Sequence, residues 1–397
     1  MTTVSPTPTD AELTARFRPV LDSIALGAAD RDRNRELPHE QVRLLRDAGF
    51  TALRVPVEYG GLGATVRQTF AQLTDLAAAD SNLTQALRVH FFTVEGFLAT
   101  GDAEGLRRAG EGIIYGNAIS EKGVGAVDRY QTRLTPADDG NYQLNGTKYY
   151  STGTLYADVI SVAADLDGRR VTVLVDADAP GVHQFDDWDG FGQRLTGSGT
   201  TVFTGVAVDA AAVTEGGYGD EGHVIDTAYL QLFHLSALAG IARRAADDAR
   251  DRVETRDRTF SHAPADLPRE DPLVQAVLGR VYSAASVARA SVLAVADAVA
   301  ASFDSPGDIA LIDAAELASS EAQVVLAPLV LDAVSEAFET GGASVASEKL
   351  DLDRHWRNAR TLAVHNPLVY KQQAVGRYHL TGDGLAFAWS AGVRTAD

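Results

Sequence analysis

Two histidines carry side chains that suit acid–base chemistry on a bound small molecule. His365 lies in VHNPLVY, just before Pro367 at a predicted helix start, where a side chain can reach into a cleft as a proton donor or base. His90 lies in the apolar helical segment ALRVHFFTVE, where a structural role is the commoner one. A third histidine, His234 in LFHLSALAG, fits a core or interface position better than a catalytic one.

Ser151 lies in the segment on which we expect the chemistry to centre, residues 144–158, LNGTKYYSTGTLYAD. A turn at Asn145-Gly146 leads into a β-rich run that ends in Ser151-Thr152-Gly153. Small hydroxyl and glycine residues at such a corner allow a flat ligand to approach the backbone closely. The segment therefore predicts one wall of a ligand site.

Three further features could bind a flat, phosphorylated ligand. Trp188, in the glycine-rich stretch DWDGFG, is equally suited to stacking on a flat ring and to closing the end of a barrel. Gly341-Gly342 first of all ends a helix, but its backbone could also be approached by a phosphate. Arg258, near the end of another helix, belongs either to a solvated face or to a phosphate clamp.

Composition and missing motifs exclude several classes of function. The chain has no cysteine, hence no disulfide or thiolate zinc site, and no His-x3-His pair, so we expect no metal. The net charge of -19 argues against nucleic acid and anionic membranes as partners. The sequence has no stretch of about 18 uninterrupted apolar residues, so we expect no membrane span. The glycines of residues 60–63 lack the spacing and the βαβ context of a dinucleotide loop.

Hydrophobic periodicity divides the chain into a helical block, a β-rich middle and a second helical block. Residues 66–79 and 81–100 are two of the helices predicted in the first block. Short β-rich segments between residues 113 and 206, separated by turn signals, predict an antiparallel barrel or sandwich. Long alanine-rich helices follow from about residue 223, as in an up-down bundle. The predicted fold is mainly α within the α+β class, with domains at 1–111, 112–215 and 216–397.

These segments, in this order, resemble the acyl-CoA dehydrogenase superfamily over nearly the whole chain. The family pattern of Leu-Asn-Gly-x-Lys, an aromatic residue, a small-residue corner and Ala-Asp is matched by residues 144–158. GQRLTGSGTT, residues 192–201, is similar to the family's barrel exit, and RHWRNAR, residues 354–360, to the run before its active-site loop. The resemblance implies an N-terminal helical domain, a central β-barrel and a C-terminal four-helix bundle, with a flavin held between them.

One position favours oxygenation over dehydrogenation within this resemblance. Many dehydrogenases of the family have a catalytic glutamate shortly after the arginine-rich run, in a Tyr-Glu-Gly context. Here that place reads Val364-His365-Asn366-Pro367, so the carboxylate that would remove an α-proton is missing from it. His365, together with Ser151 and His90, instead resembles the flavin-dependent monooxygenase branch, which includes enzymes of organosulfur metabolism.

That branch implies that the chain takes reduced flavin, FMNH2 (with FAD as the alternative), from a separate NAD(P)H-dependent flavin reductase. A flavin hydroperoxide formed with O2 would oxygenate a small, organosulfur substrate. His365 would donate a proton or stabilise the peroxide, Ser151 would bind near flavin N5, and His90 would act as acid–base or orienting group. The implied flavin contacts are Asn117, Ser120, Ser151, Trp188, Arg258, Gly341 and Gly342, with the phosphate partly held by a neighbouring subunit.

Other functions on the same fold stay open. One is an FAD-dependent acyl-CoA dehydrogenase with its base elsewhere, and another is an N-hydroxylating relative acting on an amine or amino sugar. A third is a flavin or acyl-carrier binding module without enzymatic activity. The family expectation for assembly is a homotetramer. The N-terminus has neither a basic n-region nor an apolar h-region, so we expect no signal peptide and a cytoplasmic location.

Overall fold

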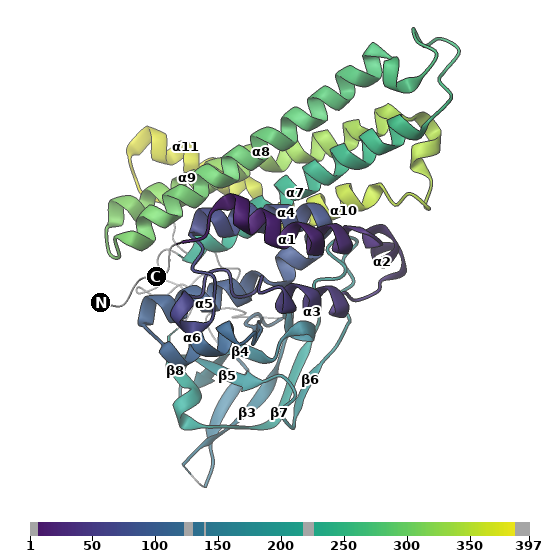
Figure 1. The fold of residues 1–397 in the computed structure, drawn as a ribbon. Coiled ribbons are helices and arrows are strands. Elements are labelled where there is room, and N and C mark those ends of the chain that lie inside the picture. Colours follow the sequence, from purple (N-terminus) through teal and green to yellow (C-terminus); the bar gives the residue numbers. More distant parts are fainter. Residues whose placement is uncertain (1–6, 123–129, 139, 217–225, 386–397) are drawn as a thin grey trace.

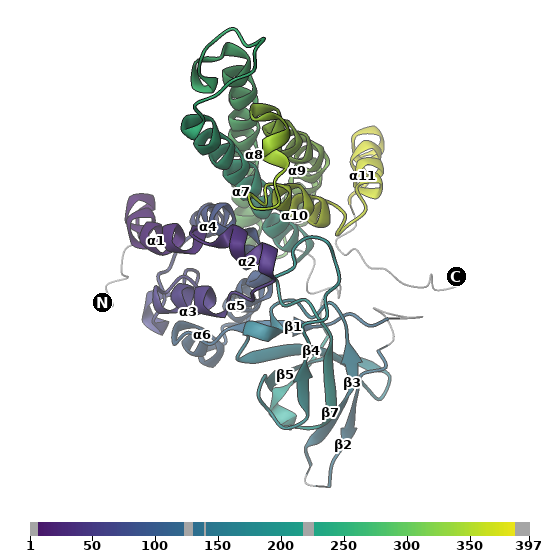
Figure 2. The same ribbon diagram turned by 90° about the vertical axis from the view of Figure 1, so that its right-hand side faces the viewer.

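The computed structural model describes residues 7–122, 130–138, 140–216 and 226–385 (Figure 1). A sheet of eight strands lies at one end, long helices form a bundle at the other, and the N-terminal helices lie between them (Figures 1 and 2). The predicted α+β fold, with a helical domain, a β-rich middle and a helical bundle, is confirmed.

Six helices form the N-terminal block: α1 Asp10–Ala25, α2 Ala28–Asn34, α3 His39–Asp47, α4 Val66–Ala86, α5 Arg88–Thr100 and α6 Ala103–Gly110. The break predicted at residue 80 is a kink inside α4, where Asp80 has an extended backbone (φ -158°, ψ 108°). Its carboxylate accepts from Asn82 N at 3.1 Å, as an N-cap does, and also pairs with Arg31 of α2 at 3.1 Å. The kink therefore begins a second helical segment with its own cap.

The strands form one mixed sheet in the order β6-β7-β3-β2-β4-β5-β8, with β1 beside β4. Their bounds are β1 Tyr115–Ala118, β2 Arg133–Pro136, β3 Tyr142–Lys148, β4 Val159–Leu166, β5 Arg169–Asp176, β6 Val182–Gln184, β7 Thr201–Val208 and β8 Val213–Glu215. The predicted antiparallel pairing is wrong for β1 and for β2, which both run parallel to β4. The reason is topological: β3 runs antiparallel to β2, and the chain then reverses again, so that β4 has the direction of β1 and β2.

The C-terminal block consists of α7 Asp226–Thr255, α8 Pro272–Asp304, α9 Ile309–Glu336, α10 Asp353–Ala363 and α11 Leu368–Thr381. Small residues let α7 cross α4 closely, as their alanine-rich faces predict. A Cβ atom on Gly240 of α7 would lie only 2.4 Å from that of Ala77 of α4. This contact joins the bundle to the N-terminal block.

By length and composition alone, α8 and α9 are apolar enough to cross a membrane, which the sequence analysis does not predict. Both pack along α7 in the bundle (Figure 1), and Val292 of α8 and Val330 of α9 are fully buried there. Core helices of soluble proteins share this property, so it is a weak indication of a membrane span.

The N-terminal helices and the bundle share one hydrophobic core. It extends from Phe17 of α1 through Phe70 of α4 and Phe233 of α7 to Val330 of α9. The rings of Phe70 and Phe233 meet edge to face with centroids 4.8 Å apart. The sheet has a separate core, which includes Leu144, Ile160, Val173 and Phe203. The β-rich part is thus inserted between two helical blocks that pack on each other.

Candidate active site

The predicted small-residue corner follows the end of β3, where the sheet meets the N-terminal helices. Tyr150 has a φ of 57° and Gly153 one of 79°, so the chain turns sharply on both sides of Ser151. Ser151 N donates to Gly199 O and Gly153 N to Thr196 O, both at 3.0 Å. The corner and the barrel exit, two segments that carry the family resemblance, therefore form one surface.

Two polar atoms at this corner are buried without a hydrogen-bond partner among the described residues: Ser151 Oγ and Asn117 Oδ1. Ser151 is fully buried, and Asn117 is 9% exposed. They are neighbours, because Asn117 N of β1 donates to Thr152 O at 3.3 Å. Leaving such a group unpaired costs about 1–3 kcal/mol, so we expect a ligand to supply the partners. A flavin fits, since the edge of its ring system carries both donors and acceptors.

Ser120 and Lys148 connect the segment after β1 to this corner through hydrogen bonds. Ser120 O accepts from Tyr149 N at 2.9 Å. Lys148 is fully buried, donates to Ile119 O at 3.0 Å and lies 2.8 Å from Glu121 Oε1. Desolvation lowers the pKa of Lys148 to about 8, although the charge of Glu121 opposes the shift. The segment that is predicted to contact flavin is therefore fixed to β3 by a buried ion pair.

The barrel exit is held from both helical blocks. Leu195 N donates to Asn82 Oδ1 at 3.1 Å, just after the kink in α4. Gln193 N donates to Asn358 Oδ1 of α10 at 2.6 Å, and Gln193 Nε2 donates to Ser81 Oγ at 3.0 Å. All three parts of the chain meet here, so the position of the corner depends on α4 and α10.

His365 lies in the turn between α10 and α11, and its ring centroid is 4.2 Å from that of His234 on α7. His234 is buried, whereas part of His365 is exposed. Desolvation by the surrounding protein and the positive charge of Arg88 lower the pKa of both imidazoles. We therefore expect a neutral His365, with one ring nitrogen donating and the other accepting.

Helix α5 directs Arg88, and not His90, toward this histidine pair. Arg88 Nη1 lies 3.3 Å from His234 Nε2. Residues two apart on a helix point about 200° apart, so His90 faces the opposite side. There its Nε2 lies 2.8 Å from Thr51 O, and its Nδ1 accepts from Tyr115 N at 3.4 Å. The structure thus gives His90 a packing role behind β1, and its predicted acid–base role finds no support in this geometry.

Arg88 and His234 are site residues that the sequence analysis misses. It expects His234 in a core or interface position, and the residue is indeed buried, but the contact with His365 links positions far apart in the chain. For Arg88 a signal existed, because a charged residue within an apolar helical face needs a partner inside the protein. That signal did not identify the partner.

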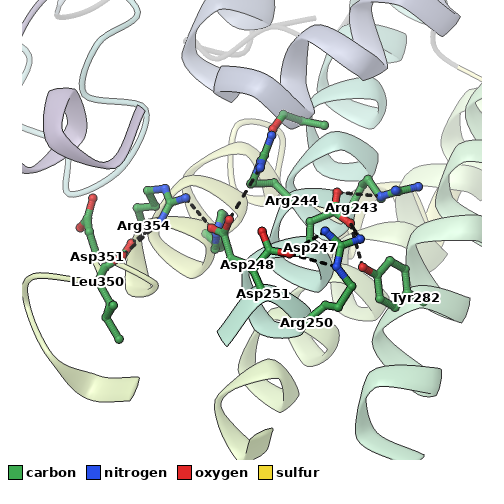
Figure 3. Close-up of polar contacts among 12 residues, drawn as sticks. Arg243, Arg244, Asp247, Asp248, Arg250, Asp251, Tyr282, Leu350, Asp351 and Arg354 are labelled. Carbon is green, nitrogen blue, oxygen red and sulfur yellow. Dashed lines mark hydrogen bonds and ion pairs between the residues drawn. The ribbon is translucent and has the colours of Figure 1, made fainter. Parts of the chain in front are cut away.

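Figure 3 shows how α10, which leads into His365, is fixed against α7. Asp248 of α7 accepts from Arg354 Nη2 at 2.6 Å and from His355 Nε2 at 2.8 Å, and Arg244 Nη1 lies 3.7 Å from it. Desolvation opposes ionisation, but these three partners still hold the pKa of Asp248 well below its usual range. The carboxylate is therefore ionised at neutral pH and holds α10 against α7.

Trp188 lies beside the corner, at the edge of the sheet. Its indole Nε1 donates to Gly192 O at 3.1 Å, and its ring meets that of Tyr150 edge on, with centroids 5.9 Å apart. A Cβ atom on Gly190 would lie 2.0 Å from the indole, so the loop folds tightly over it. Trp188 therefore stabilises the loop to which it belongs. Its ring also contacts Tyr150, the residue next to Ser151.

The predicted phosphate-binding residues lie at the far end of the bundle. Arg256 Nη1 donates to Gly341 O at 2.8 Å, Phe260 packs against Gly342, and Arg258 is exposed. Helix α7 separates this end from His234 by roughly 30 Å, at about 1.5 Å of rise per residue, which exceeds the length of FMN. A single chain therefore does not bring Arg258 and the Gly341-Gly342 turn to the Ser151 corner.

His90 and His355 are buried, neutral imidazoles that should weaken the fold in acid. Desolvation lowers the pKa of each to about 4. As pH falls from about 6.5 toward 4, the unfolded chain takes up these protons and the folded chain does not, so stability is lost in that window. For His90 we expect a loss on the order of 3 kcal/mol. Urea unfolding across this pH range would measure it. His90→Gln should show a shallower decline, and an unchanged decline would contradict the assignment.

Comparisons with known proteins extend over all three parts of the chain. Family models described as acyl-CoA dehydrogenase N-terminal, middle and C-terminal domains match residues 8–114, 116–206 and 232–369. A dibenzothiophene monooxygenase from Mycolicibacterium goodii is 30% identical over 371 residues, which cover 88% of this chain and 89% of that protein. The probable FMNH2-dependent monooxygenase SfnC from Pseudomonas putida is 26% identical, with 91% and 93% covered.

A solved structure shares the same arrangement. The crystal structure of TdsC from Paenibacillus sp. A11-2 with FMN and indole matches with a TM-score of 0.84 at 28% identity. The match covers 94% of this chain and 99% of TdsC.

Proposed function

Because this chain belongs to the acyl-CoA dehydrogenase family, we propose that it is an FMNH2-dependent monooxygenase that transfers one atom of O2 to a small organosulfur substrate. The observation that carries the proposal is the imidazole of His365 at the α10–α11 turn. Burial and the positive charge of Arg88 lower the pKa of this imidazole, and a hydrogen bond with Asn366 raises it. No described carboxylate is among these groups. A carboxylate at this turn would suit desaturation, whereas the N–H of a neutral imidazole is suited to donate a hydrogen bond to an oxygen atom of the ligand.

The residues of the corner would bind FMN by its ring system. FMN, when bound in its reduced form, supplies two electrons and activates O2. Ser151 Oγ and Asn117 Oδ1 would hydrogen-bond to the polar edge of the ring, with Ser120 beside them and Trp188 at its flank. The neutral imidazole of His365 would donate a hydrogen bond at the reacting edge.

A neighbouring copy of the chain would supply the phosphate contacts. Arg258 and the Gly341-Gly342 turn are too far from Ser151 to serve the same flavin, but a second subunit could present them to it. A homotetramer satisfies this requirement, and sedimentation would test it. Arg258→Ala should then weaken FMN binding without changing the assembly, whereas unaltered FMN binding would remove Arg258 from the site.

A separate NAD(P)H-dependent reductase would supply the FMNH2, in the cytoplasm. The glycines of residues 60–63 form a tight loop rather than a nucleotide site. A Cβ atom on Gly61 would lie 2.0 Å from Val55 O, so this backbone packs against the protein itself.

The test of the function combines the purified chain, a flavin reductase, NADH, FMN and O2. We expect oxygenated product from an organosulfur substrate only when the reductase is present. Tightly bound FAD in the purified protein that is bleached by an acyl-CoA would instead identify a dehydrogenase. Cell fractionation would test the cytoplasmic location.

Ser151→Ala isolates the contribution of the corner. The variant removes a buried hydroxyl that has no hydrogen-bond partner in the part of the chain that the structure describes, so stability should be unchanged or slightly higher. FMN affinity should fall about tenfold, the equivalent of one lost hydrogen bond. Fluorescence titration of FMN and thermal unfolding measure the two effects. Thr135→Ala, at an exposed hydroxyl on β2, is the control. Equal FMN affinity in the two variants would contradict the role of Ser151.

A further inference from the structure

Helix α11, which follows His365 in the chain, is attached to the bundle by a buried lysine. It packs mainly on α9, at the outside of the bundle (Figure 2). Of its residues, all of which the structure describes, Lys371 and Ala374 alone are buried, whereas the apolar side chains of Val369 and Leu380 are exposed. An apolar face therefore does not account for the position of α11.

The ammonium group of Lys371 lies in a polar junction between α9 and α11. Lys371 is fully buried, and its Nζ donates to Ser320 Oγ of α9 at 3.2 Å. Desolvation lowers the pKa of this lysine, and the negative charge of Glu316, one turn earlier on α9, opposes the shift. Because a buried cation without a counter-charge is costly, the attraction to Glu316 keeps Lys371 at this place on α9.

The same carboxylate also holds the beginning of α7. Glu316 is fully buried, and its Oε1 accepts from Ala228 N at 2.6 Å. Ala228 lies in the first turn of α7, where backbone N–H groups have no partner inside the helix. The helix dipole also favours a negative charge at this end. Glu316 therefore joins α7 and α11 on one face of α9.

The two joined helices determine where the histidine pair lies. His234 lies six residues after Ala228 on α7, and Lys371 lies six residues after His365. The ring centroids of the two histidines are 4.2 Å apart. Contacts thus form a closed circuit, from Glu316 along α7 to His234, across to His365, and along the chain to Lys371 and back to Glu316. Since the turn that carries His365 is exposed, this circuit fixes it from the side of α11.

We infer that Lys371 is a positioning residue, which holds α11 on Glu316 and thereby keeps the imidazole of His365 beside His234 during oxygen transfer. The inference rests on the proposed monooxygenase function and concerns the same site. Stability alone does not require a lysine here, because packed hydrocarbon in place of a buried ion pair is often neutral or stabilising. Hydrocarbon contacts have no preferred direction, however, so an apolar residue would not fix where α11 lies along α9.

The test removes both charges, so that no buried carboxylate is left without its counter-charge. Lys371→Met/Glu316→Gln replaces the ion pair by neutral side chains of similar length, and the glutamine keeps an oxygen for Ala228 N. Thermal unfolding and FMN affinity should stay like those of the wild type. The ratio of product to O2 consumed should fall about 10- to 100-fold, as for a misplaced catalytic group. Lys349→Met, at an exposed lysine, is the matched control and should keep the wild-type ratio.

A chemical rescue separates the charge of the lysine from its shape. The chain has no cysteine, so Lys371→Cys introduces a single thiol. Alkylation in urea with 2-bromoethylamine, followed by refolding, gives an aminoethyl thioether of the same length as lysine, and 1-bromopropane gives the uncharged counterpart. The aminoethyl form should regain most of the coupling, and the propyl form should not.

The outcomes distinguish this inference from the function on which it rests. If the double variant couples as well as Lys349→Met, or if the two alkylated forms couple equally, Lys371 does not position His365, and the monooxygenase function still stands. A fall in coupling that only follows an equal loss of unfolding temperature and FMN affinity would likewise overturn the inference, because Lys371 would then serve folding alone. Absence of oxygenated product from the wild type would overturn the function and the inference together.

Discussion

His365→Ala is expected to uncouple the enzyme, so that FMNH2 and O2 are consumed while product formation falls by about 100- to 1,000-fold, within the range of general acid–base contributions. The electrons then appear as hydrogen peroxide, because the group that donates a hydrogen bond at the reacting edge is gone. The loss should concern chemistry rather than folding, since His365 is partly exposed and lies in a turn. Parallel measurement of O2 uptake, peroxide and product gives the coupling ratio.

His379→Ala is the matched control for this prediction. His379 lies on the neighbouring helix α11, is exposed, and its Nε2 is 2.8 Å from Glu321 Oε1. Its removal deletes an imidazole of the same region without touching the proposed site, so coupling should stay normal. If His365→Ala retains the coupling ratio of His379→Ala, His365 does not take part in oxygen transfer.

Gly153→Ala is expected to destroy both the corner and FMN binding. Gly153 has a φ of 79°, where a side chain costs about 1–2 kcal/mol. In addition, the new Cβ would lie 2.4 Å from Ala86 O at the end of α4, and this backbone atom cannot rotate away. The corner that carries Ser151 must then move. We expect a loss of more than about 3 kcal/mol in the free energy of unfolding and a fall of at least 100-fold in FMN affinity.

Gly168→Ala separates the clash from the backbone strain. Gly168 has a similar φ of 80°, in the β4–β5 turn, but its new Cβ would meet no atom within 4 Å. This variant should lose only about 1–2 kcal/mol and bind FMN normally. Urea unfolding and FMN titration of both variants give the comparison. Equal losses would show that the approach of Ala86 to the corner is unimportant.

The order of the three parts follows from local sequence patterns, which is why it was predictable. Helical periodicity and the small residues of the Ser151 corner depend on neighbours in the chain. The predicted turn at Asn145-Gly146 is wrong, because both residues lie inside β3, where the pairing with β7 shifts at a β-bulge. The break at residue 80 was likewise readable, because Asp80 interrupts an apolar helix. Local patterns do not reveal that this break survives as a kink whose Asn82 holds the barrel exit.

Contacts between distant segments were out of reach of such patterns. The pairing of His365 with His234, and the anchoring of α10 by Asp248, depend on how helices far apart in sequence pack. The choice between Arg88 and His90 depends on the rotational phase of α5. A periodic pattern gives the apolar face of a helix, but it does not say which neighbour a polar residue on that helix will meet.

The separate core of the sheet makes the β-rich part an exchangeable module. Most of its buried residues form a cluster of their own, and only Tyr115 of β1 and Val159 of β4 pack in a small cluster with α5 and α6, whereas the two helical blocks share one large core. Calorimetric unfolding should therefore resolve into a transition of the sheet and one of the helices. A chimaera that takes its sheet from a relative should keep the helical unit intact, provided that Gln193 and Leu195 still reach Asn358 and Asn82. In such a chimaera the Ser151 corner would come from one parent and the His234–His365 pair from the other.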